Sequence, residues 1–353
     1  MDFVTAQGYL LFFVYVGLLG IGFGNWMFMK RPRGKERPCF EVMIPARDEA
    51  ENIAKVVMPL TKSGVRVTVY DDDSSDNTAK IAHEHGALIL KPTGPLPDGW
   101  TGKNNACHQL SLTSTSSWTV FLDADTVPSD TFAERLSAFL CHCDTDTKVV
   151  SGFIKMIPGR GIEPAYLTWV TWILLSTNPF ALVSRTRLGH NRFTNGQFSA
   201  WRTDCLHEVK PFEQVKSEVL EDVKIGRLLC KLKIRTEIVD MSEILSVRMY
   251  RDVHEAMRGM SKNSCDIMGS PFGSVLLAVL LLWIGLGWVS WGSYGIVILP
   301  FLLAGKLVTD RTVSAPLWVF IFAPLTITAG AFTIIWSTLM KRKGKVTWKG
   351  RTY

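Results

Sequence analysis

The sequence of 353 residues predicts an α/β domain with a mainly parallel sheet, joined to membrane-spanning helices at both ends. Three observations support this fold class. Residues 39–150 alternate between short apolar runs and polar stretches with helical periodicity, which is typical of strand–helix units. Residues 8–29 contain no charged side chain, and residues 272–340 are mostly apolar. A composition of 47% hydrophobic and 20% charged residues fits a polar domain joined to apolar segments.

The first segment, residues 1–30, is predicted to be a transmembrane anchor. About 20 apolar residues are enough to cross the bilayer core. Only one charged residue, Asp2, precedes the apolar stretch, which argues against a cleaved signal peptide. A basic cluster follows it: Lys30, Arg31, Arg33, Lys35 and Arg37. Since basic flanks favour the cytoplasmic side, the next domain is expected in the cytoplasm, at a cell membrane, with these cations facing anionic lipid.

Residues 38–265 are predicted to form the catalytic domain. The expected strands are Phe40–Ile44, Val65–Tyr70, Ala87–Leu90 and Trp118–Leu122, and the expected helices between them are Asp48–Leu60 and Asn77–His85. In open parallel sheets, ligands bind beyond the carboxyl ends of the strands. The polar motifs of this sequence follow the predicted strands, so we expect a site at that edge.

Two apolar regions allow more than one interpretation. Residues 164–183 suit either an interfacial helix on the membrane or a buried core helix. In the C-terminal region, 272–340, residues 274–308 read as two spans and 317–340 as another. Three crossings would put the basic tail, residues 341–353, outside, against the charge rule. We therefore expect a multi-pass protein in which one segment is re-entrant or the number of spans is smaller.

The net charge of +7 and the seven cysteines limit the function classes. The basic residues adjoin apolar spans, which indicates a lipid bilayer as partner and argues against nucleic acid. Cys141-His142-Cys143 has no second cluster that would complete a tetrahedral metal site, so reduced thiols are expected.

Two acidic motifs follow predicted strands. Asp71, Asp72 and Asp73 can accept hydrogen bonds from a nucleoside, although a solvated acidic turn is the alternative. Asp123 and Asp125, spaced i and i+2, can both point at one site. Carboxylate oxygens suit Mg²⁺ or Mn²⁺, which also hold substrate phosphates. This motif therefore predicts a divalent metal that neutralises a diphosphate leaving group.

Further motifs carry a cation or acids. Lys103 lies between glycines and two amides, and it could reach a phosphate or a ribose, or belong to an ordinary surface loop. Glu221 and Asp222 open a predicted helix, where a carboxylate could act as general base or merely complement the helix dipole. Arg258 and Lys262, with Arg248 and Arg251, could bind a diphosphate or face lipid headgroups.

The order of these motifs resembles the family 2 glycosyltransferases over residues 39–265. That resemblance implies a GT-A fold, a nucleotide-sugar donor with a UDP-sugar favoured, a divalent metal and inversion at the anomeric carbon. It assigns the metal to Asp123 and Asp125, and catalysis to Asp222, the general base, with Glu221. It assigns the following residues to donor binding: Pro45, Arg47, Glu49, Asp71, Asp72, Lys103, Asp123 and Gly196. The two basic residues Arg258 and Lys262, named above, complete the predicted donor-binding set.

A narrower resemblance concerns the acceptor. The sequence around Lys103, residues 261–263 and the closing residues 348–353 resemble the branch that glycosylates carotenoid acids and hopanoid-type lipids. Two departures stand out: Asp73 replaces a more usual Gly, and the late Gln-x-x-Arg-Trp signature of processive synthases is absent. We therefore expect one sugar to be transferred to an apolar membrane lipid. The alternatives are transfer to a polyprenyl phosphate, as in dolichol-phosphate-sugar synthases, and a catalytically silent scaffold or transporter, whose function would survive Asp125→Ala and Asp222→Asn.

Overall fold

The computed structural model describes residues 3–186, 190–264, 270–342, 347–348 and 351–352. The chain divides into two compact units. A helical unit comprises Met1–Phe28, Met156–Leu182 and Arg248–Tyr353, and a sheet unit comprises Met29–Lys155 and Val183–Val247. These boundaries differ from the predicted domain 38–265, because residues 156–182 and 248–265 belong to the helical unit.

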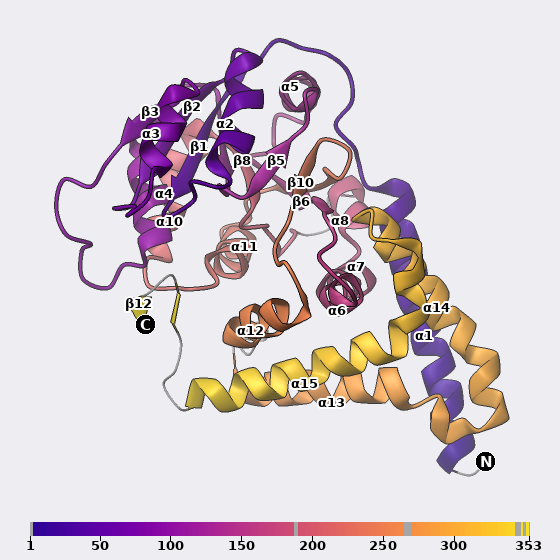
Figure 1. The fold of residues 1–353 in the computed structure, drawn as a ribbon. Helices are drawn as coiled ribbons and strands as arrows, with labels where there is room; N and C mark the ends of the chain where they lie inside the picture. The colour runs from indigo at the N-terminus through magenta and orange to yellow at the C-terminus, as the bar shows by residue number, and fades with distance from the viewer. Residues whose placement is uncertain (1–2, 187–189, 265–269, 343–346, 349–350, 353) are drawn as a thin grey trace. The chain divides into compact units, whose positions relative to one another are not determined.

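The sheet unit is built on a mixed, mainly parallel sheet with the strand order β3-β2-β1-β4-β8-β6-β9 among the described residues (Figure 1). The strands are β1 (Phe40–Ala46), β2 (Arg66–Asp71), β3 (Leu88–Leu90), β4 (Trp118–Leu122), β6 (Val149–Phe153), β8 (Phe198–Arg202) and β9 (Thr236–Asp240). The first four in the order are mutually parallel, whereas β8 is antiparallel to both of its neighbours. The fold class predicted from the sequence is confirmed.

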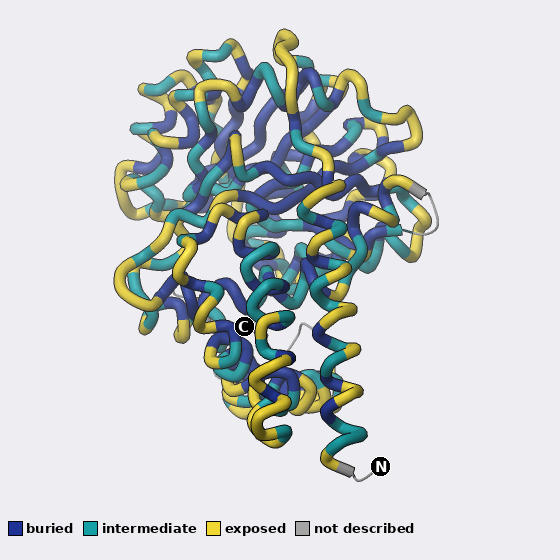
Figure 2. Tube along the Cα trace, turned by 90° about the vertical axis from the view of Figure 1, so that its right-hand side faces the viewer, coloured by how far each residue is buried: buried dark blue, intermediate teal, exposed yellow. Residues whose placement is uncertain are grey.

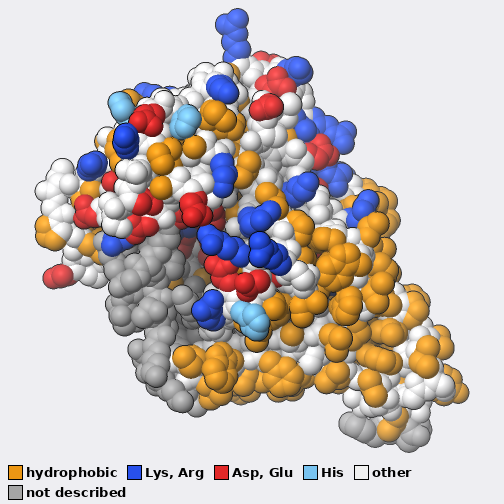
Figure 3. Space-filling model, in the orientation of Figure 1, with side chains coloured by type: hydrophobic (Ala, Val, Ile, Leu, Met, Phe, Trp, Pro, Cys, Tyr) orange, Lys and Arg blue, Asp and Glu red, His pale blue; other side chains and the backbone are white. Residues whose placement is uncertain are grey.

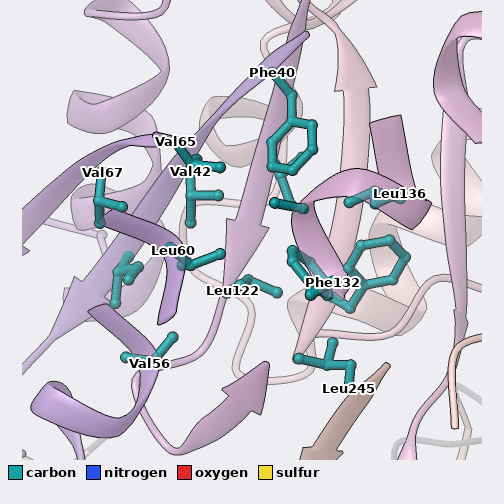
Figure 4. Close-up of a cluster of buried hydrophobic side chains, with 14 of the residues drawn as sticks. Phe40, Val42, Val56, Leu60, Val65, Val67, Leu122, Phe132, Leu136 and Leu245 are labelled. Carbon is teal, nitrogen blue, oxygen red and sulfur yellow. The ribbon is translucent and has the colours of Figure 1, made fainter. Parts of the chain in front are cut away.

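Helices cover both faces of this sheet, and its strands are mostly buried except for the edge strand β3 (Figure 2). One face packs on α2 (Ile53–Lys62), α3 (Thr78–Glu84) and α5 (Phe132–His142), and Figure 4 shows part of that apolar layer. The other face packs on α4 (Gly102–Leu112), α9 (Thr203–Val209), α10 (Pro211–Gln214) and α11 (Glu221–Lys231). Alternate residues of β1 serve the two layers, since Val42 belongs to the first core and Met43 to the second.

The four predicted strands are confirmed to within two residues at each end. One local prediction was wrong. The helix expected from Asp48 begins at Ile53, because Asp48 has a φ of 52° and lies in a turn. Lys103, for which an ordinary surface loop was the alternative interpretation, lies in the first turn of α4, whose N-cap Thr101 accepts a hydrogen bond from Asn104 N (3.3 Å).

The basic segment after the predicted anchor pairs with acids of β9. Lys30 Nζ lies 3.2 Å from the buried Glu237, and Arg31 Nε lies 2.8 Å from the buried Asp240. Lys30 also forms a parallel β-bridge with Val239. Protein carboxylates therefore pair with these two cations, and the expectation that the basic cluster faces lipid headgroups stays a prediction.

The helical unit contains α1 (Phe3–Phe28), α6 (Glu163–Leu167), α7 (Trp169–Thr177), α12 (Val253–Asn263), α13 (Pro271–Leu286), α14 (Ser293–Thr312) and α15 (Ala323–Arg342). Within it, α13 lies alongside α15 and α1 alongside α14 (Figure 1). Exposed apolar side chains gather over these helices (Figure 3).

Among the described residues, three helices are long and apolar enough to cross a membrane: Val4–Phe28, Ser293–Thr312 and Leu317–Met340. The 16 residues of α13 fall short of the usual minimum. The protein is therefore membrane-associated. The number of crossings stays a prediction, and most of the basic tail, including Lys343 and Lys345, lies outside the described residues.

Residues 164–183 form short helices, α6 and α7 followed by α8 (Phe180–Thr186), broken at Thr168 and Asn178. Trp169 and Trp172 are each only 1% exposed and belong to the core of the helical unit. Trp169 and Trp172 therefore fit the interpretation as a buried core helix better than that as an interfacial helix on the membrane. The fully buried Lys306 of α14 pairs with Asp310 and donates to Thr168 Oγ1 (2.8 Å).

Phe132 is a fully buried aromatic side chain that α5 contributes to the first core. It is 1% exposed and packs edge-on against Phe40, with ring centroids 6.2 Å apart. Phe132→Ala is expected to cost about 3–5 kcal/mol, because it removes buried area and leaves a cavity. Thermal unfolding in detergent would detect this loss, while Leu112→Ala, at a residue that is 58% exposed, should change stability by about 0.5 kcal/mol or less.

Candidate active site

The polar motifs predicted from the sequence lie at the carboxyl ends of three adjacent parallel strands. Pro45 lies near the end of β1, Asp71 ends β2, and Asp123 follows β4. The strands bring these residues to one edge because β1 pairs in parallel with both β2 and β4. This is the edge at which open α/β sheets bind ligands.

The first group at this edge joins the loops after β1 and β2. Asp72 N donates to Ala46 O (2.9 Å), and Arg47 Nη1 lies 3.5 Å from Asp72 Oδ2. Ser75 N donates to Asp48 Oδ1 (2.7 Å), which ties the two loops together. Asp71 is 5% exposed, and its Oδ1 has no hydrogen-bond partner within the described residues. A buried acceptor of this kind can receive a hydrogen from a ligand.

The second group is the turn that carries Asp123 and Asp125. Thr126 donates from its N (3.1 Å) and its Oγ1 (2.8 Å) to Asp123 O, which fixes the turn. Asp123 N donates to Gln197 O (3.3 Å), which connects the turn to the segment before β8. Burial and the nearby Asp123 and Glu49 carboxylates raise the pKa of Asp125 to about 7.

Lys103 links this turn to the start of α11. Its Nζ lies 2.8 Å from Asp123 Oδ1 and 2.9 Å from Glu221 Oε1, and it donates to Gly196 O (3.4 Å). Although burial disfavours the charged ammonium, the Asp123 and Glu221 carboxylates raise the pKa of Lys103 well above its usual value. One cation therefore holds together two acids that are far apart in sequence.

Asp222 lies beside this bridge in the first turn of α11. Thr194 Oγ1 donates to Asp222 O (2.7 Å), and Val223 N donates to Asp222 Oδ1 (2.7 Å). A Cβ on Gly226 would lie 2.7 Å from Arg192 O, so only glycine lets α11 approach residues 192–193 this closely. Burial, and then the charge of Glu221, raise the pKa of Asp222 to about 6. A carboxylate with this pKa is mostly ionised at neutral pH and suits a general base.

Asn104 and Asn195 position the acids, although the sequence offered no role for either. Asn104 Nδ2 donates to Val215 O (2.8 Å) and Glu218 O (2.9 Å), which fixes the segment leading into α11. Asn195 Nδ2 donates to Gly152 O (2.9 Å), and its Oδ1 accepts from Gln197 N (2.9 Å). The sequence shows these side-chain amides beside the predicted site residues Lys103 and Gly196. It does not show which backbone groups they bind, because those groups lie in distant parts of the chain.

The residues around Lys103 line a small cavity of about 20 Å³, with room for one water molecule. Its polar lining includes Lys103, Asp123, Asn195, Gly196, Glu221 and Asp222, and apolar side chains such as Phe121 and Trp201 also line it. This cavity is the innermost part of the candidate site.

Within this turn, Asp125 is the acid that could hold a divalent cation. Asp125 Oδ1 is buried and has no hydrogen-bond partner within the described residues, whereas Lys103 engages both oxygens of Asp123. Among the described residues, no group of three or more His, Cys, Asp or Glu side chains is arranged to hold a metal. Mg²⁺ commonly uses only one or two protein carboxylates and takes its other ligands from substrate phosphates and water.

The structure brings together most of the residues predicted from the sequence. Lys103, Asp123, Gly196, Glu221 and Asp222 meet at the cavity, which Pro45 also lines. Glu49 acts electrostatically on Asp123 and Asp125, while Arg47, Asp71 and Asp72 form the neighbouring group. Arg258 and Lys262 lie on α12 in the helical unit, so their donor-binding role stays a prediction.

Gly196 is a sensitive point of this site. A Cβ there would lie 3.2 Å from Glu221 Oε1, 3.4 Å from Lys103 Nζ and 3.5 Å from Asp222 Oδ2. Gly196→Ala is expected to lower kcat/KM about tenfold, because it displaces these groups by a few tenths of an ångström. Steady-state kinetics would measure the loss, and Gly94→Ala, where an added Cβ meets nothing within 4 Å, is the matched control.

Comparison with known proteins agrees with this geometry. Residues 41–209 match the family described as glycosyl transferase family 2. The chain is 23% identical over 266 residues to the 4,4'-diaponeurosporenoate glycosyltransferase of Staphylococcus haemolyticus (strain JCSC1435), covering 73% of this chain and 69% of that protein. It is 20% identical over 247 residues to the protein of the same name from Staphylococcus aureus (strain USA300), covering 68% and 64%.

A solved structure of glucosyl-3-phosphoglycerate synthase from Mycobacterium tuberculosis, in complex with Mn²⁺, UDP and glucosyl-3-phosphoglycerate, aligns with a TM-score of 0.42. Its identity to this chain is 20%, and the alignment covers 70% of this chain and 80% of that one. From the family match over residues 41–209 and the motifs at the carboxyl edge of the sheet, we conclude that this chain contains a glycosyl transferase family 2 domain and that the protein is a glycosyltransferase.

Proposed function

We propose that the protein transfers a single sugar from a nucleotide sugar to a membrane lipid, with inversion at the anomeric carbon and with a divalent metal. The proposed acceptor is a carotenoid acid or a hopanoid-type apolar lipid. The observation that carries this proposal is the bridge from Lys103 to Asp123 and Glu221, with Asp222 beside it at Gly196. It unites the acids predicted for donor binding and for catalysis in one small site.

The donor would lie along the carboxyl edge of β1, β2 and β4. Asp71 and Asp72 would accept hydrogen bonds from the nucleoside, because Asp71 Oδ1 is a buried acceptor without a protein partner among the described residues. Asp125, with Asp123, would hold Mg²⁺ or Mn²⁺, which when bound neutralises the charge of a nucleoside diphosphate. A UDP-sugar is the favoured donor.

The proposed chemical step is a direct displacement. An acceptor oxygen attacks the anomeric carbon while the bond from that carbon to the phosphate oxygen breaks, and the bonding electron pair leaves with the nucleoside diphosphate. If the acceptor is an alcohol, the Asp222 carboxylate takes up its proton. If the acceptor is a carboxylic acid, it arrives ionised, and Asp222 serves to orient it. The nearby negative charge of Asp222 also stabilises the oxocarbenium-like anomeric centre.

A lipid acceptor fits both the comparisons and the helices. The two relatives described above are named for glycosylation of 4,4'-diaponeurosporenoate, a carotenoid acid. The helices of this chain expose large apolar side chains, among them Phe272, which is 79% exposed, and Val297, which is 67% exposed. We propose that the sheet unit works at the cytoplasmic face of a cell membrane, where nucleotide sugars are made.

The experiment uses the full-length protein in liposomes with Mn²⁺ or Mg²⁺ and a panel of UDP-, GDP- and dTDP-sugars. Carotenoid acids, hopanoids and polyprenyl phosphates are offered as acceptors, and mass spectrometry of the lipid extract identifies the product. We expect one hexose to be added to an apolar lipid. A glycosylated polyprenyl phosphate as the sole product would overturn the acceptor assignment, and the absence of any lipid-linked sugar would overturn the proposal.

A further inference from the structure

The segment that leads into β1 is fixed along helix α5. Arg135 Nε donates to Pro32 O (2.9 Å), and Glu36 N donates to Glu134 O (3.2 Å). At the end of the segment, Cys39 N donates to Ser137 Oγ (3.2 Å). These contacts lie within the sheet unit and set the register of Cys39 against α5.

That register places two thiols in contact. Ser137 and Cys141 are four residues apart and therefore share one face of α5. Cys141 Sγ lies 3.3 Å from Cys39 Sγ, and all six cysteines that the structure describes carry free thiols. Cys141 is exposed and Cys39 is partly buried, so a small reagent can reach the pair from solvent. The nearby thiol of Cys143 instead points at Leu140 O (3.1 Å).

We propose that Cys39 and Cys141 form a dithiol modification site, which a low-molecular-weight disulfide oxidises to an intramolecular disulfide. The exposed Cys141 thiolate attacks the reagent, forms a mixed disulfide and releases one small thiol. The Cys39 thiol then loses its proton and attacks the Cys141 sulfur, which releases the second small thiol. The protein loses two hydrogens, and the reagent is reduced to two thiols.

The geometry supports both the order of these steps and the closure of the bond. Burial, and then the neighbouring Cys141, raise the pKa of Cys39 to about 11, so Cys141 is the better first nucleophile. The sulfurs must close from 3.3 Å to the roughly 2.0 Å of a disulfide. Because Cys141 lies in the last turn of α5, where helices fray, a small backbone adjustment can supply this movement.

The bond would connect the segment that follows the predicted anchor covalently to helix α5 within the sheet unit. Neither cysteine is among the residues that line the active-site cavity. The test of this modification therefore needs no donor or acceptor.

The test treats the full-length protein in detergent with oxidised glutathione, blocks the remaining thiols with iodoacetamide and maps tryptic peptides by mass spectrometry. We expect a species that joins the peptide containing Cys39 to the peptide containing Cys141 and that disappears after reduction. Cys141 and Cys143 share one tryptic peptide, because no Lys or Arg separates them, so variants must assign the bond. Cys39→Ser and Cys141→Ser should each abolish the species, and the matched control Cys143→Ser should retain it.

Two results would overturn the proposal. In the first, all thiols of the wild-type protein remain open to alkylation after treatment with oxidised glutathione. In the second, the cross-linked species survives Cys141→Ser or is lost in Cys143→Ser, which would assign the bond to Cys143.

Discussion

Asp222→Asn is expected to lower kcat/KM for an alcohol acceptor by about 10²–10⁴-fold, the usual contribution of a general base. Asparagine keeps the shape of the side chain and can still face Gly196, but it cannot accept the proton. In the wild type, activity should fall as the pH drops through about 6, because protonation of Asp222 removes the base. This acidic limb should be missing from the residual activity of the variant. Initial rates over a range of pH would check both effects.

Glu218→Gln provides the matched control for this experiment. Glu218 lies just before α11, pairs with Lys224 (3.0 Å) and has a side chain that is 40% exposed, so its loss should change kcat/KM little. A carboxylate acceptor gives a second comparison. Turnover of that acceptor should survive in Asp222→Asn, since it brings no proton to remove. Equal losses with the alcohol and the carboxylate would contradict the assignment of Asp222 as base.

Asp125→Asn is expected to lower kcat/KM by about 10²-fold or more, because the proposed cation supplies several kcal/mol of charge stabilisation to the leaving group. The buried Oδ1 of Asp125 has no protein partner within the described residues. The amide of asparagine would therefore weaken the binding of the metal ion while disturbing few other contacts. Calorimetric titration of UDP in the presence of Mn²⁺ gives a readout besides activity. Binding should weaken in the variant and should lose its dependence on Mn²⁺.

The matched control here is Asp130→Asn, an exposed acid five residues further along the chain. It should bind UDP and Mn²⁺ as the wild type does. If Asp125→Asn bound UDP with unchanged dependence on Mn²⁺, the metal would have to be held elsewhere.

The first half of the sheet could be predicted because its signals are local. β1, β2 and β4 are short apolar runs buried on both faces, and each ends in polar residues. No such local signal marks β8, which pairs antiparallel between β4 and β6. That pairing depends on the return of the chain after residues 156–182, and those residues belong to the other unit.

The identities of the acids could be predicted, but not their mutual contacts. Lys103 was expected to contact phosphate or ribose; in the structure it bridges Asp123 and Glu221. That bridge depends on the helical start at Thr101 and on Asn104, whose amide holds the backbone before α11. Partners more than a hundred residues apart leave no periodic signal in the sequence, so the geometry of the site required the structure.

The configuration of the sugar in the lipid product distinguishes inversion from retention. The lipid made in liposomes from a donor of known anomeric configuration would be purified, and its anomeric proton would be examined by NMR. We expect the opposite configuration, because the acceptor oxygen attacks from the face opposite the leaving diphosphate with Asp222 beside it. The same configuration in donor and product would contradict a single displacement at this site.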